Sequence, residues 1–197
     1  MTVSTTKMTA RQFLMLGDDP PGVRLELVNG EIAVSPSPRP RHTRLDKRLS
    51  RILLNHIVEN DLGELLGDTD TIFGEYDVRR PDIIYFSKER QHLIKADEPI
   101  DGPPDLCVEI IGPSSTVVDR KEKFKPYAKG GVKYYWIVDP YDRTIEAYRL
   151  SGGRYRLVGR GASDDVVRLP PFPDLDISLS AIWFPQRHRP ASGPSST

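Results

Sequence analysis

Hydrophobic residues along this chain gather in short runs separated by polar turns, and one longer segment carries a helical repeat. Residues 83–86, 106–111 and 134–138 are apolar at nearly every position, which is typical of strands buried on both faces of a sheet. Residues 41–59 instead repeat apolar side chains every three or four positions, which predicts a long amphipathic helix. Strand runs around such a helix predict an α/β fold. The apolar positions of the helix are Leu45, Leu49, Ile52, Leu53 and Ile57.

Two pairs of segments around short turns predict β-hairpins. Residues 24–28 and 31–35 flank an Asn-Gly pair at residues 29–30, and this pair tolerates the positive φ angles of a type I′ turn. Residues 143–150 and 154–159 flank a Ser-Gly-Gly turn and predict a second antiparallel pair. We therefore expect an N-terminal hairpin and a C-terminal antiparallel extension of the sheet.

Three further segments have weaker patterns. A capping box at residues 9–12 predicts a short helix, and a second one at residues 116–119 predicts a helix that ends at a Gly-Gly pair. The second helix is expected to turn Phe124 and Ala128 toward the core. Residues 87–104 are rich in charged residues and proline, which predicts an exposed loop.

The composition limits the class of protein. A chain of 197 residues with 38% hydrophobic residues can bury one sizeable core, so we expect a single domain over residues 1–185. Residues 186–197 contain mostly Pro, Ser, Arg and Gly and are expected to form a disordered tail. The 28 basic and 28 acidic residues cancel, so a nucleic-acid partner would have to bind through a local basic patch.

Cysteine content and hydropathy bear on the compartment. The single Cys107 lies in a buried run, where a small core residue is the default interpretation, and it suits a reducing interior. No apolar run approaches the roughly 18 residues that a membrane span requires, so we expect no membrane partner. Residues 13–16 are too few for the apolar core of a signal peptide. These observations predict a cytoplasmic protein.

Glu109 is the one charged residue in the run 106–111. Burying an unpaired carboxylate costs roughly several kcal/mol, so a partner must neutralise it. Two partners remain open at this point: an arginine in a structural ion pair, or a divalent cation shared with Asp82, which opens another buried run. Adjacent strands lie about 4.8 Å apart, so the two carboxylates could bind one metal ion.

Two residues near the N-terminus and one helix face are further candidates. Glu26 lies on the first hairpin strand, where it either pairs with Arg24 at the surface or points into a cleft. His42 falls on the apolar side of the long helix, where an isolated histidine is more often a core residue or a cap than part of a site. The same helix carries a stripe that is either a solvated face or a set of phosphate contacts. The stripe comprises Arg41, Arg44, Arg48 and Arg51.

Taken in order, several of these residues resemble the motif set of one family. Pro81-Asp82, Glu109, a row of residues four apart on the predicted helix, and the segment 131–140 are similar to the Uma-type restriction endonucleases, which belong to the PD-(D/E)XK nuclease superfamily. The resemblance covers about residues 26–184, which is most of the chain. It implies a restriction-endonuclease-like fold, in which helices flank a mixed central sheet. The row comprises Asp119, Lys123 and Tyr127.

The resemblance also implies roles for individual side chains. Asp82 and Glu109 become ligands of Mg²⁺ or Mn²⁺. The superfamily normally has a lysine two residues after the glutamate, but that position is Ile111 here. In the Uma-type variant the lysine is displaced to the following helix, where it matches Lys123, with Lys121 as its rival. Further roles fall to Glu26, as a third ligand or a water-positioning group, and to His42, Asp119 and Tyr127 as supporting residues.

The function that the resemblance implies is a metal-dependent endonuclease that hydrolyses phosphodiester bonds in DNA. A homodimer is the expected assembly, because double-strand cleavage by one small site needs two copies. The alternative is a catalytically inactive module of the same fold that binds nucleic acid or protein. Gly112 and Tyr134 depart from residues frequent in the family, but neither is a proposed ligand. A hydrolase that uses Cys107 or a serine has no nucleophile–base pattern in its support.

Overall fold

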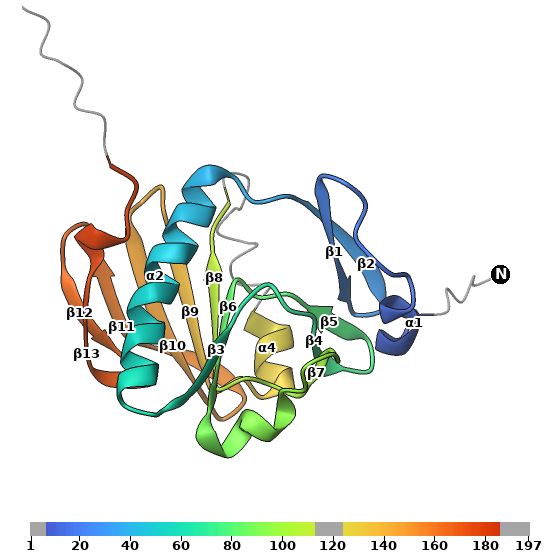
Figure 1. Cartoon of the computed structure of the whole chain (residues 1–197). Helices are drawn as coiled ribbons and strands as arrows, with labels where there is room; N and C mark the ends of the chain where they lie inside the picture. The colour runs from blue at the N-terminus through green and yellow to red at the C-terminus, as the bar shows by residue number, and fades with distance from the viewer. Residues whose placement is uncertain (1–6, 113–123, 186–197) are drawn as a thin grey trace, which may run out of the picture.

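The computed structural model describes residues 7–112 and 124–185 of the protein, and Figure 1 shows how their elements are arranged. The helices are α1 (Ala10–Leu14), α2 (Pro40–Glu59) and α4 (Phe124–Gly130), with 3₁₀ turns η1 (Lys88–Leu93) and η2 (Leu179–Ala181). The strands are β1 (Val23–Val28), β2 (Glu31–Pro36), β3 (Gly63–Leu66), β4 (Thr71–Gly74), β5 (Asp77–Arg79), β6 (Ile83–Ser87), β7 (Ile100–Asp101), β8 (Leu106–Ile110), β9 (Tyr134–Asp139), β10 (Thr144–Ser151), β11 (Arg154–Ala162), β12 (Val166–Leu169) and β13 (Phe172–Ser178).

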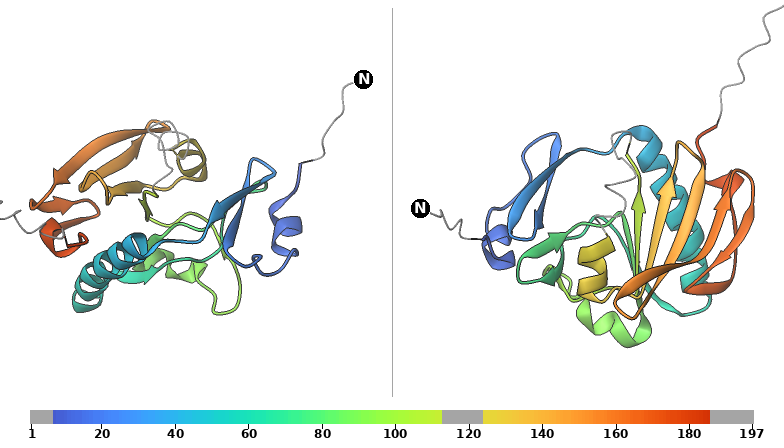
Figure 2. Two further views of the ribbon diagram at one scale, coloured as in Figure 1. Left: turned by 90° about the horizontal axis from the view of Figure 1, so that it is seen from above. Right: turned by 180° about the vertical axis from the view of Figure 1, so that it is seen from behind.

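A six-stranded sheet forms the centre of the fold, in the order β11-β10-β9-β8-β6-β3. Strand β8 runs parallel to β9 and antiparallel to β6, so the sheet is mixed, as expected. All five residues of β8 are buried, which confirms that the run around Glu109 is covered on both faces. The second predicted hairpin, β10 with β11, extends one edge of this sheet (Figure 2).

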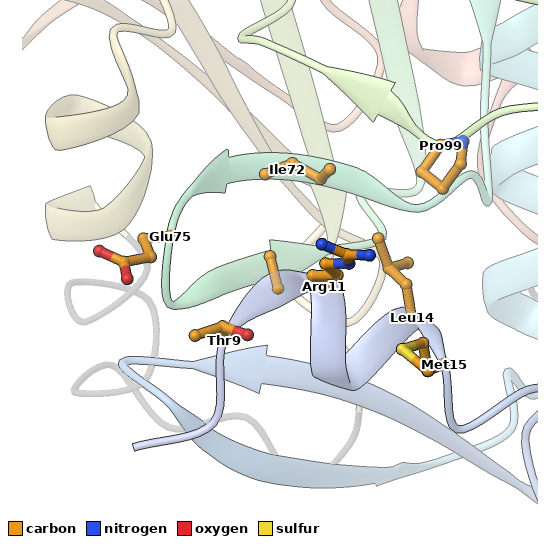
Figure 3. A pocket seen from close by; sticks show the side chains of 8 residues that line it. Thr9, Arg11, Leu14, Met15, Ile72, Glu75 and Pro99 are labelled. Carbon is orange, nitrogen blue, oxygen red and sulfur yellow. The ribbon is translucent and has the colours of Figure 1, made fainter. Parts of the chain in front are cut away.

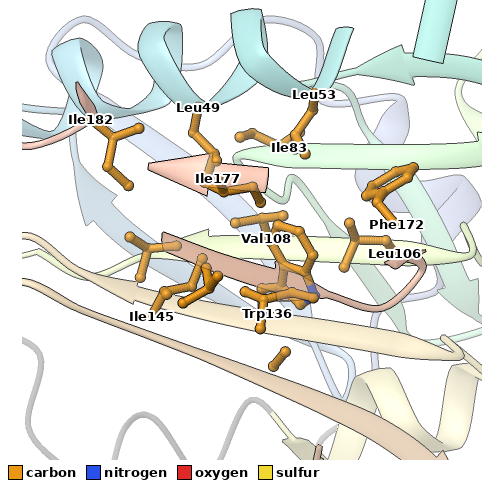
Figure 4. Packing of buried hydrophobic residues seen from close by; sticks show 14 of the residues in the cluster. Leu49, Leu53, Ile83, Leu106, Val108, Trp136, Ile145, Phe172, Ile177 and Ile182 are labelled. Atoms are coloured by element: carbon orange, nitrogen blue, oxygen red, sulfur yellow. The ribbon is translucent and has the colours of Figure 1, made fainter. Parts of the chain in front are cut away.

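Helix α2 covers one face of the central sheet. Four of its apolar side chains are no more than 1% exposed, which confirms the helical repeat predicted from the sequence. Strands β12 and β13 close the same core from the C-terminal side, and Figure 4 shows part of the packing. The side chains that meet there include Leu45, Leu49, Leu53 and Ile57 of the helix with Val108, Trp136, Phe172 and Ile177 of the strands.

The opposite face of the sheet packs against α4 and β4. Neighbours along a strand point to opposite faces, so Val108 enters the first core and Cys107 the second. The sequence pattern put Phe124 and Ala128 on the core-facing side of α4. Phe124 does pack against this second core, but both residues are only partly buried. Tyr127 is the residue of α4 that is fully buried, at 1% exposure, because its ring fills the space against β4.

A second, five-stranded sheet carries the N-terminal hairpin, in the order β2-β1-β5-β4-β7. Asn29 and Gly30 at its turn have φ angles of 52° and 85°, the positive values that a type I′ turn requires. Helix α1 packs on this sheet, and its capping box at Thr9 forms as predicted. Figure 1 shows this hairpin and the strands β12 and β13 at opposite ends of the molecule.

Residues 87–104 differ from the exposed loop that their composition predicts. The segment contains η1 and β7, and β7 pairs in parallel with β4. Ile100 anchors the short strand with 1% exposure. A single apolar residue within a polar segment shows no hydrophobic periodicity. The sequence pattern therefore could not distinguish this short strand from a loop.

Two expectations concern other parts of the chain. The beginning of the helix predicted from residue 116 and the tail expected over residues 186–197 lie outside the described residues. Of the helices that are described, none combines the length and apolar character needed to cross a membrane.

The packing of α2 predicts a difference between two adjacent leucines. Leu53 is 0% exposed, so Leu53→Ala should lower the free energy of unfolding by about 2–5 kcal/mol, the usual loss for a fully buried leucine. Leu54 is 41% exposed, and Leu54→Ala should cost about 1 kcal/mol or less. Urea unfolding followed by circular dichroism measures both values, and equal losses would contradict this orientation of the helix.

Candidate active site

Two neighbouring strands bring Asp82 and Glu109 together. Asp82 directly precedes β6, and Glu109 lies within β8. The antiparallel register pairs Ile83 with Val108, so one further step places Asp82 opposite Glu109. Directly opposed residues project from the same face, with Cβ atoms about 4.5–5.5 Å apart. The amide of Ile110 donates a hydrogen bond of 2.7 Å to Asp82 Oδ2, which ties the first carboxylate to the strand that carries the second.

Two further elements contact the Asp82 carboxylate, whose side chain is 7% exposed. Nε2 of His42, in the first turn of α2, lies 3.1 Å from Oδ2 of Asp82. On β1, Nη1 of Arg24 lies 3.6 Å from Oδ1 of Asp82, while Nη2 of Arg24 pairs with Asp68 at 2.6 Å. The negative charge of Asp82 is therefore compensated from the helix and from the N-terminal hairpin.

Glu109 is 8% exposed and has a hydrogen-bond donor on α4. The hydroxyl of Tyr127 donates to Oε1 of Glu109. Burial and the charge of Glu109 both raise the pKa of Tyr127 well above its usual value, so the tyrosine keeps its proton and remains a donor. Burial and the same glutamate also raise the pKa of the Cys107 thiol. Cys107 is thus a core residue, as predicted, without the low pKa of a catalytic thiol.

His42 is placed by the start of α2 rather than by the apolar core. Burial by itself lowers the pKa of His42, but the hydrogen bond to Asp82 and the charge of Asp82 outweigh it and raise the pKa above 6.5. The charge of Asp46 acts in the same direction, and that of Arg24 in the opposite one. The structure therefore brings His42 to the candidate site.

Glu26 does not make the surface pair with Arg24 that the sequence left open. Its Oε1 accepts a 2.9 Å hydrogen bond from the backbone amide of Arg80, and its Oε2 lies 4.0 Å from Nη1 of Arg79. The charge of Glu26 is among the causes of the raised pKa of Tyr127.

Arg24 is a site residue that the sequence analysis did not assign. The sequence pattern indicates Arg24 only as a partner for Glu26, whereas it reaches Asp82, 58 positions further along the chain. The sequence did contain a signal for the position of Arg24. Arg24 and Glu26 alternate with Leu25 on β1 and therefore project from the same face of the strand. Nothing local showed that this face turns toward Asp82.

The structure describes the arginine stripe of α2 but not the proposed catalytic lysine. Lys123, its rival Lys121, and Asp119 fall within residues 113–123, outside the part of the chain that the structure describes. Of the stripe, Arg51 is exposed to solvent. The other three members turn toward the C-terminal segment or the β9–β10 turn: Arg41 donates to the carbonyl of Pro140, Arg44 lies over Phe184, and Arg48 donates to the carbonyl of Ala181.

The donor chemistry of the pair Asp82 and Glu109 fits Mg²⁺ or Mn²⁺. Magnesium prefers oxygen ligands and is usually held by one or two carboxylates, with waters and substrate phosphates filling its other positions. In residues 7–112 and 124–185, no group of three or more His, Cys, Asp or Glu side chains could hold a metal ion. Asp82 and Glu109 would therefore be the two carboxylates that such an ion uses in this part of the chain.

A hollow of about 740 Å³ lies elsewhere, between α1 and the strand β4 (Figure 3). Its walls are mostly apolar, and Glu75 is the one acidic side chain among them. It contains neither Asp82 nor Glu109, so it has no paired carboxylates for hydrolytic chemistry. The residues labelled around it in Figure 3 are Thr9, Arg11, Leu14, Met15, Ile72, Glu75 and Pro99.

The chain is similar to a protein family and to a solved structure. Residues 10–180 match the family model described as "Uma2: Putative restriction endonuclease". The crystal structure of a "putative nuclease belonging to DUF820" from Anabaena variabilis ATCC 29413 has a similar fold, with a TM-score of 0.72 and 20% sequence identity. The similarity covers 89% of this chain and 97% of that one. No curated protein matches the chain.

The contact between His42 and Asp82 predicts a titration. In metal-free protein, His42 should titrate above 6.5, and Asp82→Asn should lower its pKa because the favourable charge is lost. The raised pKa of His42 in the folded state stabilises the fold. This stabilisation is fully present below pH 6.5 and is lost as the pH rises through the folded-state pKa of His42. NMR titration of the imidazole measures the shift. Asp61→Asn, an exposed and distant change, is the control, and equal His42 titration in both variants would refute the contact.

The contact between Tyr127 and Glu109 predicts a second difference. Tyr127→Phe should lower the free energy of unfolding by about 1.5–3 kcal/mol, since it removes a donor from a buried charged group. The matched change Tyr155→Phe removes a hydroxyl that donates to the neutral carbonyl of Val132 at 2.7 Å, and should cost about 0.5–1.5 kcal/mol. Urea unfolding of the two variants tests the order, and the reverse order would argue against a charged acceptor at Glu109.

Proposed function

The chain belongs to the Uma2 family of "putative restriction endonucleases", and on that premise we propose that it is a metal-dependent endonuclease that hydrolyses phosphodiester bonds in DNA. The family prediction made from the motif residues is thereby confirmed, because the family model spans residues 10–180. The observation that carries the proposed activity is the pairing of Asp82 with Glu109 on adjacent strands of a buried sheet.

Phosphodiester hydrolysis needs an activated water, neutralisation of charge on the phosphate oxygens, and help for the leaving oxygen. Mg²⁺ or Mn²⁺ bound at this pair would supply a more acidic water and a Lewis acid. Asp82 and Glu109 would hold the ion. Glu26 would serve as a third ligand or orient the attacking water from the adjacent hairpin.

Residues around the two carboxylates keep them in position. The Ile110 amide and His42 both contact Oδ2 of Asp82, and Tyr127 donates to Glu109. Each hydrogen bond restricts a carboxylate rotamer, so little reorganisation is needed when substrate arrives. We assign Lys123 the stabilisation of developing negative charge on the phosphate, with Asp119 as its supporting neighbour in sequence.

The substrate and assembly follow from the same proposal. The arginines of α2 would contact DNA phosphates: Arg41, Arg44, Arg48 and Arg51. Because the chain has no net charge, such contacts would be local and would weaken as salt rises. A homodimer would place one site on each strand of the duplex.

One observation favours a second candidate function, a nuclease-fold module that binds nucleic acid or protein without cleaving. Arg24 lies 3.6 Å from Oδ1 of Asp82, and a guanidinium at that position competes with a cation for the carboxylate. Calorimetric titration with Mg²⁺ or Mn²⁺ separates the two functions. Binding that is lost in Asp82→Ala and Glu109→Ala supports the endonuclease, and absent binding in wild type supports the module.

Cleavage of plasmid and single-stranded DNA with Mn²⁺ or Mg²⁺ tests the activity directly. Asp82→Ala and Glu109→Ala should each slow cleavage by about 100-fold or more, because each removes several kcal/mol of charge stabilisation. Lys123→Ala should slow it by about 100- to 1000-fold, as expected for loss of one group that stabilises developing charge. Removal of metal with EDTA should abolish cleavage.

Asp61→Ala, which removes an exposed carboxylate far from the site, is the matched control and should cleave at the wild-type rate. Equal cutting by wild type, Asp82→Ala, Glu109→Ala and Lys123→Ala would indicate a contaminating nuclease and remove support for the site.

A further inference from the structure

A second hollow, of about 400 Å³, lies between α2 and the end of the described chain. Two guanidinium groups of α2 line it, those of Arg44 and Arg48, and a third comes from the β9–β10 turn, at Arg143. Trp183 and Phe184 form its apolar wall. Neither Asp82 nor Glu109 lines it, so it is separate from the candidate active site.

The three arginines of this hollow have few acidic partners. Arg143 pairs with Asp164 at 2.8 Å, but the Asp164 side chain is 73% exposed. Arg48 donates to the backbone carbonyl of Ala181 at 2.6 Å. Arg44 lies over the ring of Phe184 at 5.1 Å. Within the described part of the chain, three positive charges therefore meet one weakly held carboxylate, so the hollow favours an anion.

Two guanidinium nitrogens here are buried donors with no hydrogen-bond partner in the described structure. They are Nε of Arg44 and Nε of Arg143. A buried donor without an acceptor is unfavourable, because the protein removes it from water and supplies nothing in return. Protein atoms cover both nitrogens, but the guanidinium groups that carry them line the hollow, and guanidinium groups match phosphate oxygens in geometry.

The turn that carries Arg143 is built with a strained residue. Arg143 has a φ angle of 52°, a left-handed conformation that a long side chain adopts infrequently. The turn is held by Asp139, whose Oδ1 accepts hydrogen bonds of 2.8 Å from the amide of Tyr141 and 3.0 Å from that of Asp142. Such strain often marks a functional position. Asparagine or glycine would fit this turn better, so an arginine here points to a role for its guanidinium.

The hollow and the candidate active site lie on different sides of α2. Residues of an α-helix rise by about 1.5 Å and turn by about 100° each, so Arg44 and Arg48 lie roughly 3 Å and 9 Å along the axis from His42 but project from another side of the helix. Arg41 lies next to the hollow, because its guanidinium lies over the rings of Tyr141 and Phe184 at 5.4 and 5.6 Å, and Phe184 lines the hollow.

We infer that Arg44, Arg48 and Arg143 form a subsite for a backbone phosphate of the DNA other than the phosphate held at Asp82 and Glu109. The inference rests on the proposed function, since it takes DNA as the substrate. A phosphate contact fixes the position of the strand but reads no base. The subsite therefore sets affinity and register rather than sequence preference.

Binding of a short fluorescein-labelled DNA duplex, in EDTA so that metal-dependent cleavage cannot occur, tests the subsite. Arg143→Asn removes the charge and suits the positive φ angle, so its stability should equal or exceed that of wild type. Its affinity should fall by about fivefold to tenfold, and the slope of log affinity against log salt should decrease in magnitude by about 1. Arg44→Gln should lower affinity to a similar degree. Fluorescence anisotropy measures affinity, and thermal melting measures stability.

Arg154→Asn is the matched control, because Arg154 is exposed at the opposite end of the β10–β11 hairpin. It should bind DNA as wild type does. If Arg143→Asn and Arg44→Gln also bind as wild type while Asp82→Ala abolishes cleavage, the subsite is refuted and the endonuclease stands. If wild type binds no DNA, both proposals fail.

Inorganic phosphate at constant ionic strength separates a strand phosphate from a small-anion site. Competition by phosphate should weaken DNA binding of wild type more than that of Arg143→Asn. If phosphate stabilises wild type but not Arg143→Asn to heat, while DNA affinity is the same in both, the hollow binds a small anion and the inference is overturned.

Discussion

Burying two carboxylates side by side within a sheet is unfavourable in free energy, and many of the surrounding residues offset this cost. The side chain of Asp82 is 7% exposed, and Glu109 is 8% exposed. Removing such charges from water costs roughly several kcal/mol each, and three neighbouring elements contribute groups that offset this cost. Helix α2 supplies His42, β1 supplies Arg24, and α4 supplies the hydroxyl of Tyr127. The central sheet sets the two acids in register, α2 and β1 place His42 and Arg24 at Asp82, and α4 places a hydrogen-bond donor at Glu109.

Helix α2 contributes both to the stability of the fold and to the proposed chemistry, because one side packs in the core and other positions carry charged site residues. One side buries apolar residues at every turn and holds the first core together. Its first turn presents His42 to Asp82, and the next turns present Arg44 and Arg48 to the C-terminal segment. Rotation or displacement of this helix would therefore disturb the core, the contact of His42 with Asp82, and the hollow lined by Arg44 and Arg48. A rigid element that carries several site residues keeps their spacing constant.

The fold and the function rest on different observations. The similarity to the solved structure from Anabaena variabilis, at 20% identity, concerns the fold alone, and one fold can carry active and inactive members. The case for catalysis depends instead on Asp82 and Glu109 lying together with their supporting donors. Arg24 beside Asp82 bears on the same question from the other side, because it can stabilise the metal-free carboxylate. A cation at this site would therefore compete with the guanidinium of Arg24 for the carboxylate.

Local patterns in the sequence determined the elements whose signals repeat or whose turns need special residues. The long helix, the Asn29-Gly30 hairpin and the buried run around Glu109 are of this kind, and the burial of Glu109 already demanded a partner. Only the tertiary structure decided which groups meet that demand. Arg24 reaches Asp82, and Arg143 joins the arginines of α2, through contacts between segments far apart in the chain. Such contacts depend on how sheets and helices pack, which no local period encodes.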